Sequence, residues 1–177
     1  MRILDLIACG LATLSLAAAG CGEEPADEAS SGSGAEQEMT AEQASGAEPK
    51  TTGPAGEKPT ITIPEGAEPP GELQIEDISP GKGAVAKAGD QLTVNYVGVS
   101  FSSGEEFDTS FGREPFPFQL GAQMVIPGWD QGLEGMKVGG RRQLTIPPDL
   151  AYGPQGQPPV IAPNETLVFA IDLLSID

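Results

Sequence analysis

The sequence contains no histidine, and this absence excludes several kinds of catalytic site. Without an imidazole, the chain cannot form a Ser-His-Asp or Cys-His triad, a histidine-bearing zinc site or an imidazole acid or base. Its two cysteines, Cys9 and Cys21, are too few for a four-thiolate metal site or for a framework of several disulfides. These absences exclude a metal site built on histidine or on four thiolates, and no metal site of another kind is predicted.

Basic residues are also scarce. The 177 residues include 9 Lys+Arg against 26 Asp+Glu, which gives a formal net charge of −17. Nucleic-acid phosphates are bound by lysine and arginine, so this balance argues against a nucleic-acid partner. The length allows one domain, or two small ones.

Large apolar side chains are scarce in residues 22–72. Residues 22–72 contain eight glycines, seven prolines, 12 acidic and 2 basic residues, and no aromatic residue. Such a stretch cannot bury enough apolar surface to offset the entropy of the chain, so we expect a disordered acidic linker. All nine aromatic residues lie from Tyr96 onward, which predicts one folded domain of common size over residues 73–177.

The first 21 residues are typical of an export signal. Arg2 supplies a positive start, an apolar stretch over residues 6–19 is too short to span a bilayer comfortably, and small residues precede Cys21. Residues 18–21 (AAGC) resemble a bacterial lipobox, which implies lipidation of Cys21 and a lipid anchor in the cell envelope. Cleavage after Ala19 by the ordinary signal rule is the alternative. Gly22, rather than Asp, after Cys21 favours the outer membrane.

Residues 73–177 show a pattern of strands with one helix. Alternating apolar residues predict strands over residues 73–78, 91–99, 116–120, 143–146 and 166–176. A short helix is expected from Pro127, because Trp129, Leu133 and Met136 share one helical face, and Gly139-Gly140 should end it. Several antiparallel strands with one packed helix indicate an α+β fold.

Five blocks of this domain carry a specific resemblance. They are VNYVG (94–98), EFDTS (106–110), PFPFQLG (115–121), VIPGWDQGLEGMKVGGRRQLTIPPDLAYG (125–153) and TLVFAIDLL (166–174). Their order and spacing resemble the FKBP-type peptidyl-prolyl isomerases over residues 73–177 and nowhere before them. The resemblance implies an antiparallel sheet of about five strands wrapped around one short helix, and catalysis of cis–trans rotation at X–Pro bonds without a cofactor.

The resemblance also implies roles for individual residues. Trp129 should form the floor of an apolar proline pocket, and the Ile126 N–H and the Tyr152 hydroxyl should bind substrate carbonyls. Asp108 should polarise the pocket and pair with Arg113. The loop that closes over the site should contain Val160 and Ile161. The expected pocket walls are Tyr96, Phe107, Phe116 and Phe169, with Val125 and Ile126 at one edge.

Structural roles compete with these functional ones. Trp129 is expected both to line the pocket and to pack the helix on the sheet, whereas Phe118 is expected to belong to the core alone. Asp108 could instead be a simple turn residue. For the whole domain, a non-catalytic module or holdase chaperone that binds proline-containing segments is the alternative to an isomerase.

The expected partners follow from the same resemblance. They are proline-containing polypeptides and macrolides of the tacrolimus and rapamycin type. We expect a monomer that is exported and lipid-anchored, with its domain facing the periplasm or the exterior. Its substrates would be exported or envelope proteins.

Overall fold

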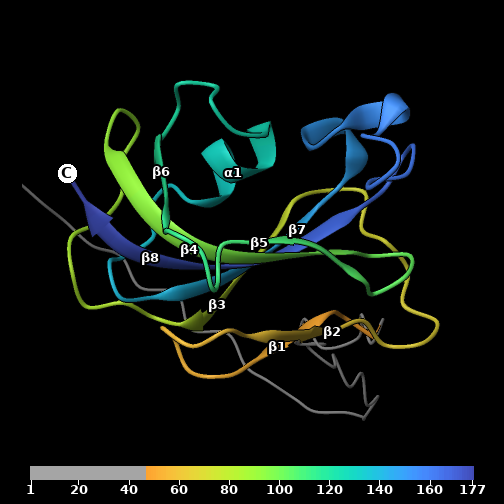
Figure 1. The fold of residues 1–177 in the computed structure, drawn as a ribbon, viewed down its shortest axis with the longest axis horizontal. Helices are drawn as coiled ribbons and strands as arrows, with labels where there is room; N and C mark the ends of the chain where they lie inside the picture. The colour runs from red at the N-terminus through yellow and green to blue at the C-terminus, as the bar shows by residue number, and fades with distance from the viewer. Residues whose placement is uncertain (1–46) are drawn as a thin grey trace, which may run out of the picture. The chain divides into compact units, whose positions relative to one another are not determined.

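The computed structural model describes residues 47–177, which form one α+β domain (Figure 1). The predicted signal, Cys21 and residues 22–46 lie outside the described residues. No helix among the described residues is long and apolar enough to cross a bilayer. In chain order the elements are β1 (Lys50–Thr52), β2 (Thr60–Thr62), β3 (Gln74–Ser79), β4 (Gln91–Ser100), β5 (Glu106–Thr109), β6 (Phe116–Gln119), α1 (Pro127–Gly132), β7 (Arg141–Ile146), the 3-10 turns η1 (Pro148–Leu150) and η2 (Gly153–Gln155), and β8 (Leu167–Ile176).

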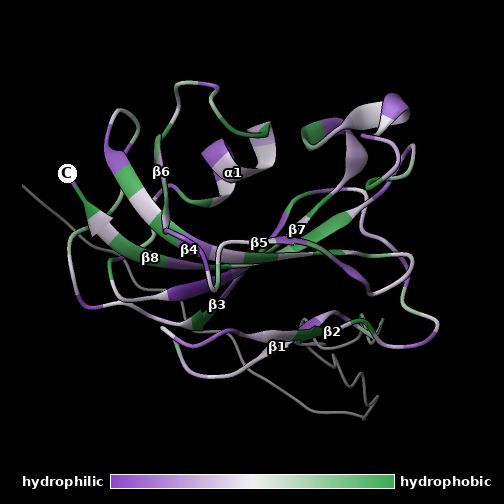
Figure 2. Cartoon of the chain, viewed as in Figure 1, coloured by the Kyte–Doolittle hydropathy of each residue, from purple (hydrophilic) through white to green (hydrophobic). Residues whose placement is uncertain are grey.

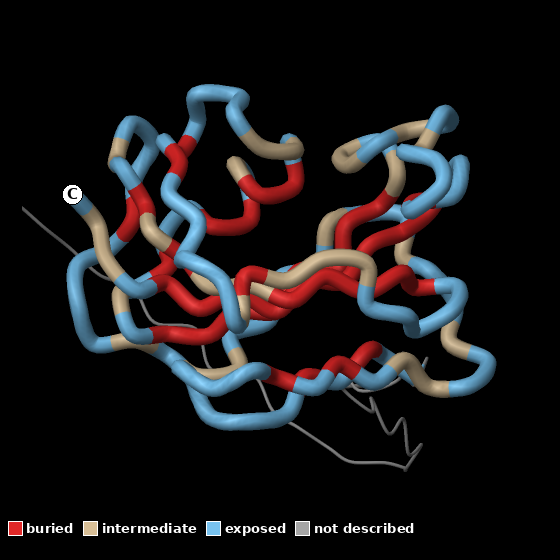
Figure 3. Tube along the Cα trace, viewed as in Figure 1, coloured by how far each residue is buried: buried red, intermediate tan, exposed pale blue. Residues whose placement is uncertain are grey.

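The main sheet is antiparallel, with strand order β3-β7-β8-β4-β5 and with β6 paired to β4. Helix α1 lies on one face and the β1–β2 hairpin on the other (Figure 1). The central strands are therefore buried on both faces, as the tube in Figure 3 shows. The expected sheet wrapped around one short helix is confirmed, and β5 is a strand that the sequence pattern did not predict.

Alternation along β8 divides the core into two clusters. Phe169 and Ile171 face the helix, where they join a cluster with Leu92, Phe118, Trp129, Leu144 and Ile146. Val168 and Ala170 face the hairpin. Phe118 is fully buried, which confirms its expected place in the core.

Helix α1 is shorter than the sequence predicted. It begins with Pro127 at its first turn and ends at Gly132, well before Gly139-Gly140. Gly135 has φ +78°, a left-handed conformation that a helix cannot contain. Leu133 and Met136 nevertheless remain buried in the same cluster as Trp129, so the expected apolar face is confirmed although the helix itself stops early.

The glycines of α1, which are poor helix formers, allow the helix to lie close to β7. A Cβ on Gly128 would lie 2.4 Å from Cγ2 of Ile146, and a Cβ on Gly132 would lie 2.7 Å from Cδ1 of Leu144. Both distances are far inside van der Waals contact. Larger residues at these two positions would push the helix, and Trp129 with it, away from the sheet.

The prediction of a disordered linker over residues 22–72 is wrong for residues 47–72. Residues 50–62 form the β1–β2 hairpin, and Ile61 is only 8% exposed. Ile61 packs into the second cluster, with Val97, Val99, Phe101, Val168 and Ala170, and Ile63 and Ala67 pack against it. The ordered domain therefore begins before residue 73, because the outer face of the sheet needs this cover.

Polar contacts also hold the hairpin against the sheet. Arg141 is fully buried and pairs with Asp172 at 2.6 Å. The guanidinium also donates to the carbonyl of Gly53 at 2.9 Å, and the Gly56 N–H donates to Asp172 at 2.7 Å. A buried ion pair is tolerated when its remaining hydrogen-bonding positions are filled, and here the hairpin backbone fills them.

The composition of the β1–β2 hairpin gave no sign that it is folded. Figure 2 shows that β1 and β2 are less hydrophobic than the middle of β8. Their partners lie far away in the sequence: Gln143 accepts a hydrogen bond from the Thr51 hydroxyl and donates to the carbonyl of Pro49 at 2.9 Å. A pattern within residues 22–72 cannot reveal contacts of this kind.

Replacing Ile61 by alanine tests this correction. We expect Ile61→Ala to lower the free energy of unfolding by about 2 kcal/mol, because it leaves a cavity against the outer face of the sheet. The control is Ile75→Ala, at a position that is 48% exposed, where we expect a change of less than about 1 kcal/mol. Urea unfolding of the three proteins measures both values. Equal stability of wild type and Ile61→Ala would show that the packing of Ile61 against the sheet does not stabilise the domain.

Candidate active site

Aromatic side chains from five elements surround one cavity of about 180 Å³, which we call the cup. Tyr96 comes from β4, Phe107 from β5, Phe116 from β6, Trp129 from α1 and Phe169 from β8. The cavity is lined by Tyr96, Phe107, Asp108, Phe116, Met124, Val125, Ile126, Trp129, Tyr152 and Phe169. Nine of these were predicted from the sequence. Met124 was not, and no sequence signal marked it.

Trp129 is held in place by rings that meet it edge to face. Its ring centroid lies 5.2 Å from that of Tyr96 and 5.3 Å from that of Phe169, with interplanar angles of 78° and 89°. Such T-shaped pairs are a favourable aromatic geometry. The indole Nε1 is buried and has no hydrogen-bond acceptor among the described residues. Trp129 both lines the cup and packs in the core, as expected.

Gly98 makes room for two walls of the cup. It lies opposite Phe169 in the β4–β8 register and opposite Asp108 in the β4–β5 register. A Cβ at this position would lie 2.7 Å from both Phe107 Cζ and Phe169 Cε1. The ring centroids of Phe107 and Phe169 lie 5.6 Å apart, with an interplanar angle of 89°. The rings can approach in this way because Gly98 has no side chain between them. No sequence signal marked Gly98.

Two hydrogen-bond donors at the cup have no protein acceptor among the described residues. Ile126 is the N-cap of α1, and its carbonyl accepts from the Trp129 N–H at 2.9 Å. Its own N–H donates to none of the described residues. The Tyr152 hydroxyl, at a side chain that is part-exposed between η1 and η2, likewise makes no hydrogen bond with them. An apolar cup with two free donors can hold a carbonyl-bearing apolar group.

Asp108 lies on β5 and anchors a hydrogen-bond cluster, so it is more than a turn residue. The Tyr96 hydroxyl donates to one of its carboxylate oxygens, and Arg113 donates to the other at 2.5 Å. The expected Asp108–Arg113 pair is thus confirmed. Burial alone would raise the pKa of Asp108. The hydrogen bonds from Tyr96, Arg113 and the Thr109 N–H outweigh that effect and hold the pKa below its usual range.

The two tyrosines of the cup remain protonated at neutral pH. Burial, and then the hydrogen bond to Asp108, raise the pKa of Tyr96 well above its ordinary value. Burial, and then the charge of Asp108, also raise the pKa of Tyr152. The cup therefore holds an ionised carboxylate and two neutral phenols, and none of these groups titrates near neutral pH.

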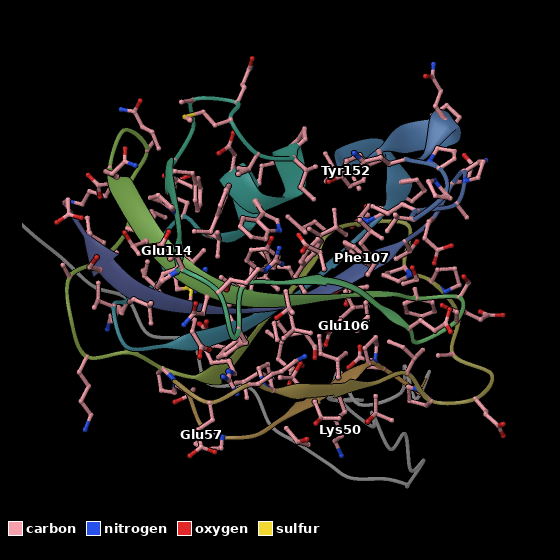
Figure 4. All side chains as sticks on the ribbon, in the orientation of Figure 1. Lys50, Glu57, Glu106, Phe107, Glu114 and Tyr152 are labelled. Carbon is pink, nitrogen blue, oxygen red and sulfur yellow. The ribbon has the colours of Figure 1, made fainter. Side chains whose placement is uncertain are left out.

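The structure does not bring Val160 and Ile161 to the cup. Ile161 is 2% exposed and belongs to the core, because its backbone pairs with Gln157 and turns its side chain inward. Val160 is 55% exposed. Both residues line a neighbouring groove of about 590 Å³ that shares Phe107 with the cup. Figure 4 shows Tyr152 above Phe107, on the side of the sheet where α1 lies.

Comparison with known proteins identifies this arrangement. Residues 82–174 match the family model described as FKBP-type peptidyl-prolyl cis-trans isomerase. The chain belongs to this family. A curated relative, the FK506-binding protein of Streptomyces anulatus, is 57% identical over 122 residues, which cover 68% of this chain and 98% of the relative. The resemblance found in the sequence is confirmed, and the chain is a member of an isomerase family.

Further relatives agree. A probable FK506-binding protein of Corynebacterium glutamicum is 52% identical over 120 residues, covering 67% of this chain and 98% of that protein. Among solved structures, AtFKBP13 is 36% identical with a TM-score of 0.56, over 59% of this chain and 93% of that one. FkpA from Escherichia coli is 45% identical with a TM-score of 0.54, over 59% of this chain and 48% of that one.

The space above Gly98 is expected to be essential to the shape of the cup. Gly98→Ala should lower kcat/KM for an X–Pro peptide by about tenfold, because the new methyl group displaces Phe107 and Phe169. A matched control is Gly71→Ala, where a Cβ meets nothing within 4 Å. Rates are compared at a temperature at which circular dichroism shows all three proteins folded. Unchanged turnover in folded Gly98→Ala would show that these two rings do not shape the site.

Proposed function

We propose that this chain accelerates X–Pro rotation in exported or envelope proteins, with the aromatic cup as its catalytic site. The observation that carries the proposal is the pairing of an apolar aromatic cavity with two free donors, the Ile126 N–H and the Tyr152 hydroxyl. The family identity supports it, because an isomerase needs a site for the proline ring.

The chemistry requires neither a nucleophile nor a proton transfer. Amide resonance gives the X–Pro bond a rotation barrier of about 18–20 kcal/mol, and unaided isomerisation takes tens to hundreds of seconds. At the twisted transition state that resonance is lost, and the amide is less polar than in its planar ground state. An apolar cavity therefore binds the transition state better than the ground state, which lowers the barrier.

Each part of the cup has a separate role in the proposed mechanism. The indole of Trp129 supports the proline ring, and the walls keep water from the amide. The Ile126 N–H and the Tyr152 hydroxyl bind carbonyl groups on either side of the rotating bond and fix one half of the peptide. Asp108 accepts a hydrogen bond from the Tyr96 hydroxyl, and this bond orients the Tyr96 ring. Macrolides of the tacrolimus and rapamycin type would occupy the same cavity, as the names of the FK506-binding relatives suggest.

The holdase alternative draws support from the exposed apolar side chains at the rim of the cup. Met124 is 65% exposed and Phe116 and Tyr152 are each part-exposed, so an unfolded segment could bind there without being turned over. The two functions differ in one measurable respect. A holdase suppresses aggregation in proportion to its concentration, whereas an isomerase accelerates a proline-limited step at substoichiometric amounts.

The test of catalysis uses the chain without residues 1–21 and a short apolar-X–Pro peptide. We expect acceleration that excess macrolide abolishes, and a loss of about tenfold or more in kcat/KM for Phe107→Ala. A matched control is Phe111→Ala, because Phe111 packs against the second cluster, away from the cup. A folded wild-type protein that leaves the isomerisation rate unchanged would contradict the proposal and favour the holdase.

Envelope anchoring rests on the sequence of residues 1–21 and on Cys21 as the lipidated residue. Two or three acyl chains would hold the protein stably at a membrane, and the outer membrane is favoured. The protein would be a monomer, with its cup free to bind exported polypeptides. We expect the full-length protein to sediment with membranes and to carry the mass of a diacylglyceryl group at Cys21. Cys21→Ala should leave it soluble. Membrane-extracted protein with an unmodified terminus at Gly20 or Gly22 would contradict the anchor.

A further inference from the structure

A second groove lies directly beside the cup. Its volume is about 590 Å³, and Phe107 forms part of both cavities. One wall comes from residues 100–106, at the end of β4 and the start of β5, and the other from residues 158–163. A polypeptide with its proline in the cup can place neighbouring residues in this groove, because the two cavities share Phe107.

The groove contains a buried carboxylate that no cation neutralises. Glu165 is 8% exposed and lines the groove. One of its oxygens accepts from the Ser102 N–H and the other from the Ser102 hydroxyl, both at 2.9 Å. Within the described part of the chain, no lysine or arginine lies within 4.0 Å of it. A buried charge with only neutral partners gains free energy when a cation approaches.

A second acidic side chain stands at the same wall. Glu105 is exposed, and its carboxylate has no partner among the described residues. Glu106 also borders the groove, but it pairs with Lys58 at 2.9 Å. Figure 4 places Glu106 on the hairpin side of β5 and Phe107 on the opposite side. The uncompensated charge in the groove is therefore that of Glu105 and Glu165, and no basic residue lines it.

The opposite wall suits an aliphatic stem. It consists of Pro158, Pro159, Val160, Ile161, Ala162 and Pro163. Prolines have no N–H, so this wall offers few donors that would compete for the two carboxylates. Lysine and arginine bury their methylene groups on apolar surface while the charged end reaches polar partners. Charge and shape together match a basic side chain.

We propose that this groove binds a lysine or arginine side chain of the polypeptide whose proline occupies the cup. The proposal rests on the proposed use of the cup as the proline site, and it adds a preference among substrates. The basic residue would lie close to the proline in the peptide sequence and on one side of it, because the cup and the groove share Phe107. Glu165 is the inner contact and Glu105 the outer one.

The test uses peptides that share one apolar-X–Pro core and carry Lys, Gln or Glu at single positions on either side. We expect kcat/KM to follow the order Lys, Gln, Glu at one side of the proline only, with a Lys-to-Glu ratio of about three to ten. The ratio should fall toward one as salt is raised, because added ions screen the pair. The fluorescence of the one tryptophan, Trp129 in the cup, reports binding of the same peptides independently of turnover.

Three variants show whether the groove is the source of the preference. Glu105→Gln and Glu165→Gln should each reduce the Lys-to-Glu ratio of kcat/KM. Because Glu105 is exposed, Glu105→Gln should leave the fold intact. Glu76→Gln is the matched control, because β3 and β5 lie at opposite ends of the sheet order; it should leave the ratio unchanged. A general effect of the negative net charge would act equally in all three.

The outcomes separate this inference from the proposed function. Charge-dependent binding without turnover would support the groove and contradict catalysis. Turnover with equal rates for Lys and Glu peptides would support catalysis and overturn the groove. A preference that survives both Glu105→Gln and Glu165→Gln, or that Glu76→Gln reduces equally, would also overturn it.

Discussion

The close approach of α1 to β7 is the contact on which the site depends. Only glycine at positions 128 and 132 lets the helix lie against Ile146 and Leu144. That approach places Trp129 under the rings of Tyr96 and Phe169, and it leaves the Ile126 N–H at the edge of the cavity. Glycine at these two positions lowers the intrinsic stability of the helix. The packing of the apolar face of α1 against the sheet outweighs that loss. A third glycine, Gly98 on β4, also shapes the site, because its missing side chain makes room for the rings of Phe107 and Phe169.

The opposite face of the sheet shows how a polar segment can belong to a core. The β1–β2 hairpin contributes few apolar side chains, yet its carbonyl groups complete the hydrogen bonding of Arg141, and its Gly56 N–H completes that of Asp172. Without the hairpin, that buried pair and the apolar row around Val168 would face water. The hairpin also carries Lys58, which neutralises Glu106 and so defines which acidic residues remain free near the groove.

Much of the fold and site could be predicted because the informative residues are large and local in pattern. Alternation identified the long strands, the apolar face identified α1, and the sequence blocks around Tyr96, Trp129 and Tyr152 identified the family. The hairpin was missed because its partners lie outside residues 22–72, as the contact of Thr51 with Gln143, 92 residues away, illustrates. The resemblance put Ile161 in the loop that closes over the site, whereas backbone pairing with Gln157 turns its side chain into the core.

The central claim is that X–Pro rotation takes place on Trp129. Exchange spectroscopy by NMR on an X–Pro peptide with substoichiometric protein measures the interconversion rate, while the indole N–H resonance of Trp129 reports occupancy of the cup. The account predicts accelerated exchange together with an indole shift that saturates at the same peptide concentration as the rate. Accelerated exchange with an unmoved indole resonance would contradict it, because rotation would then occur somewhere other than the cup.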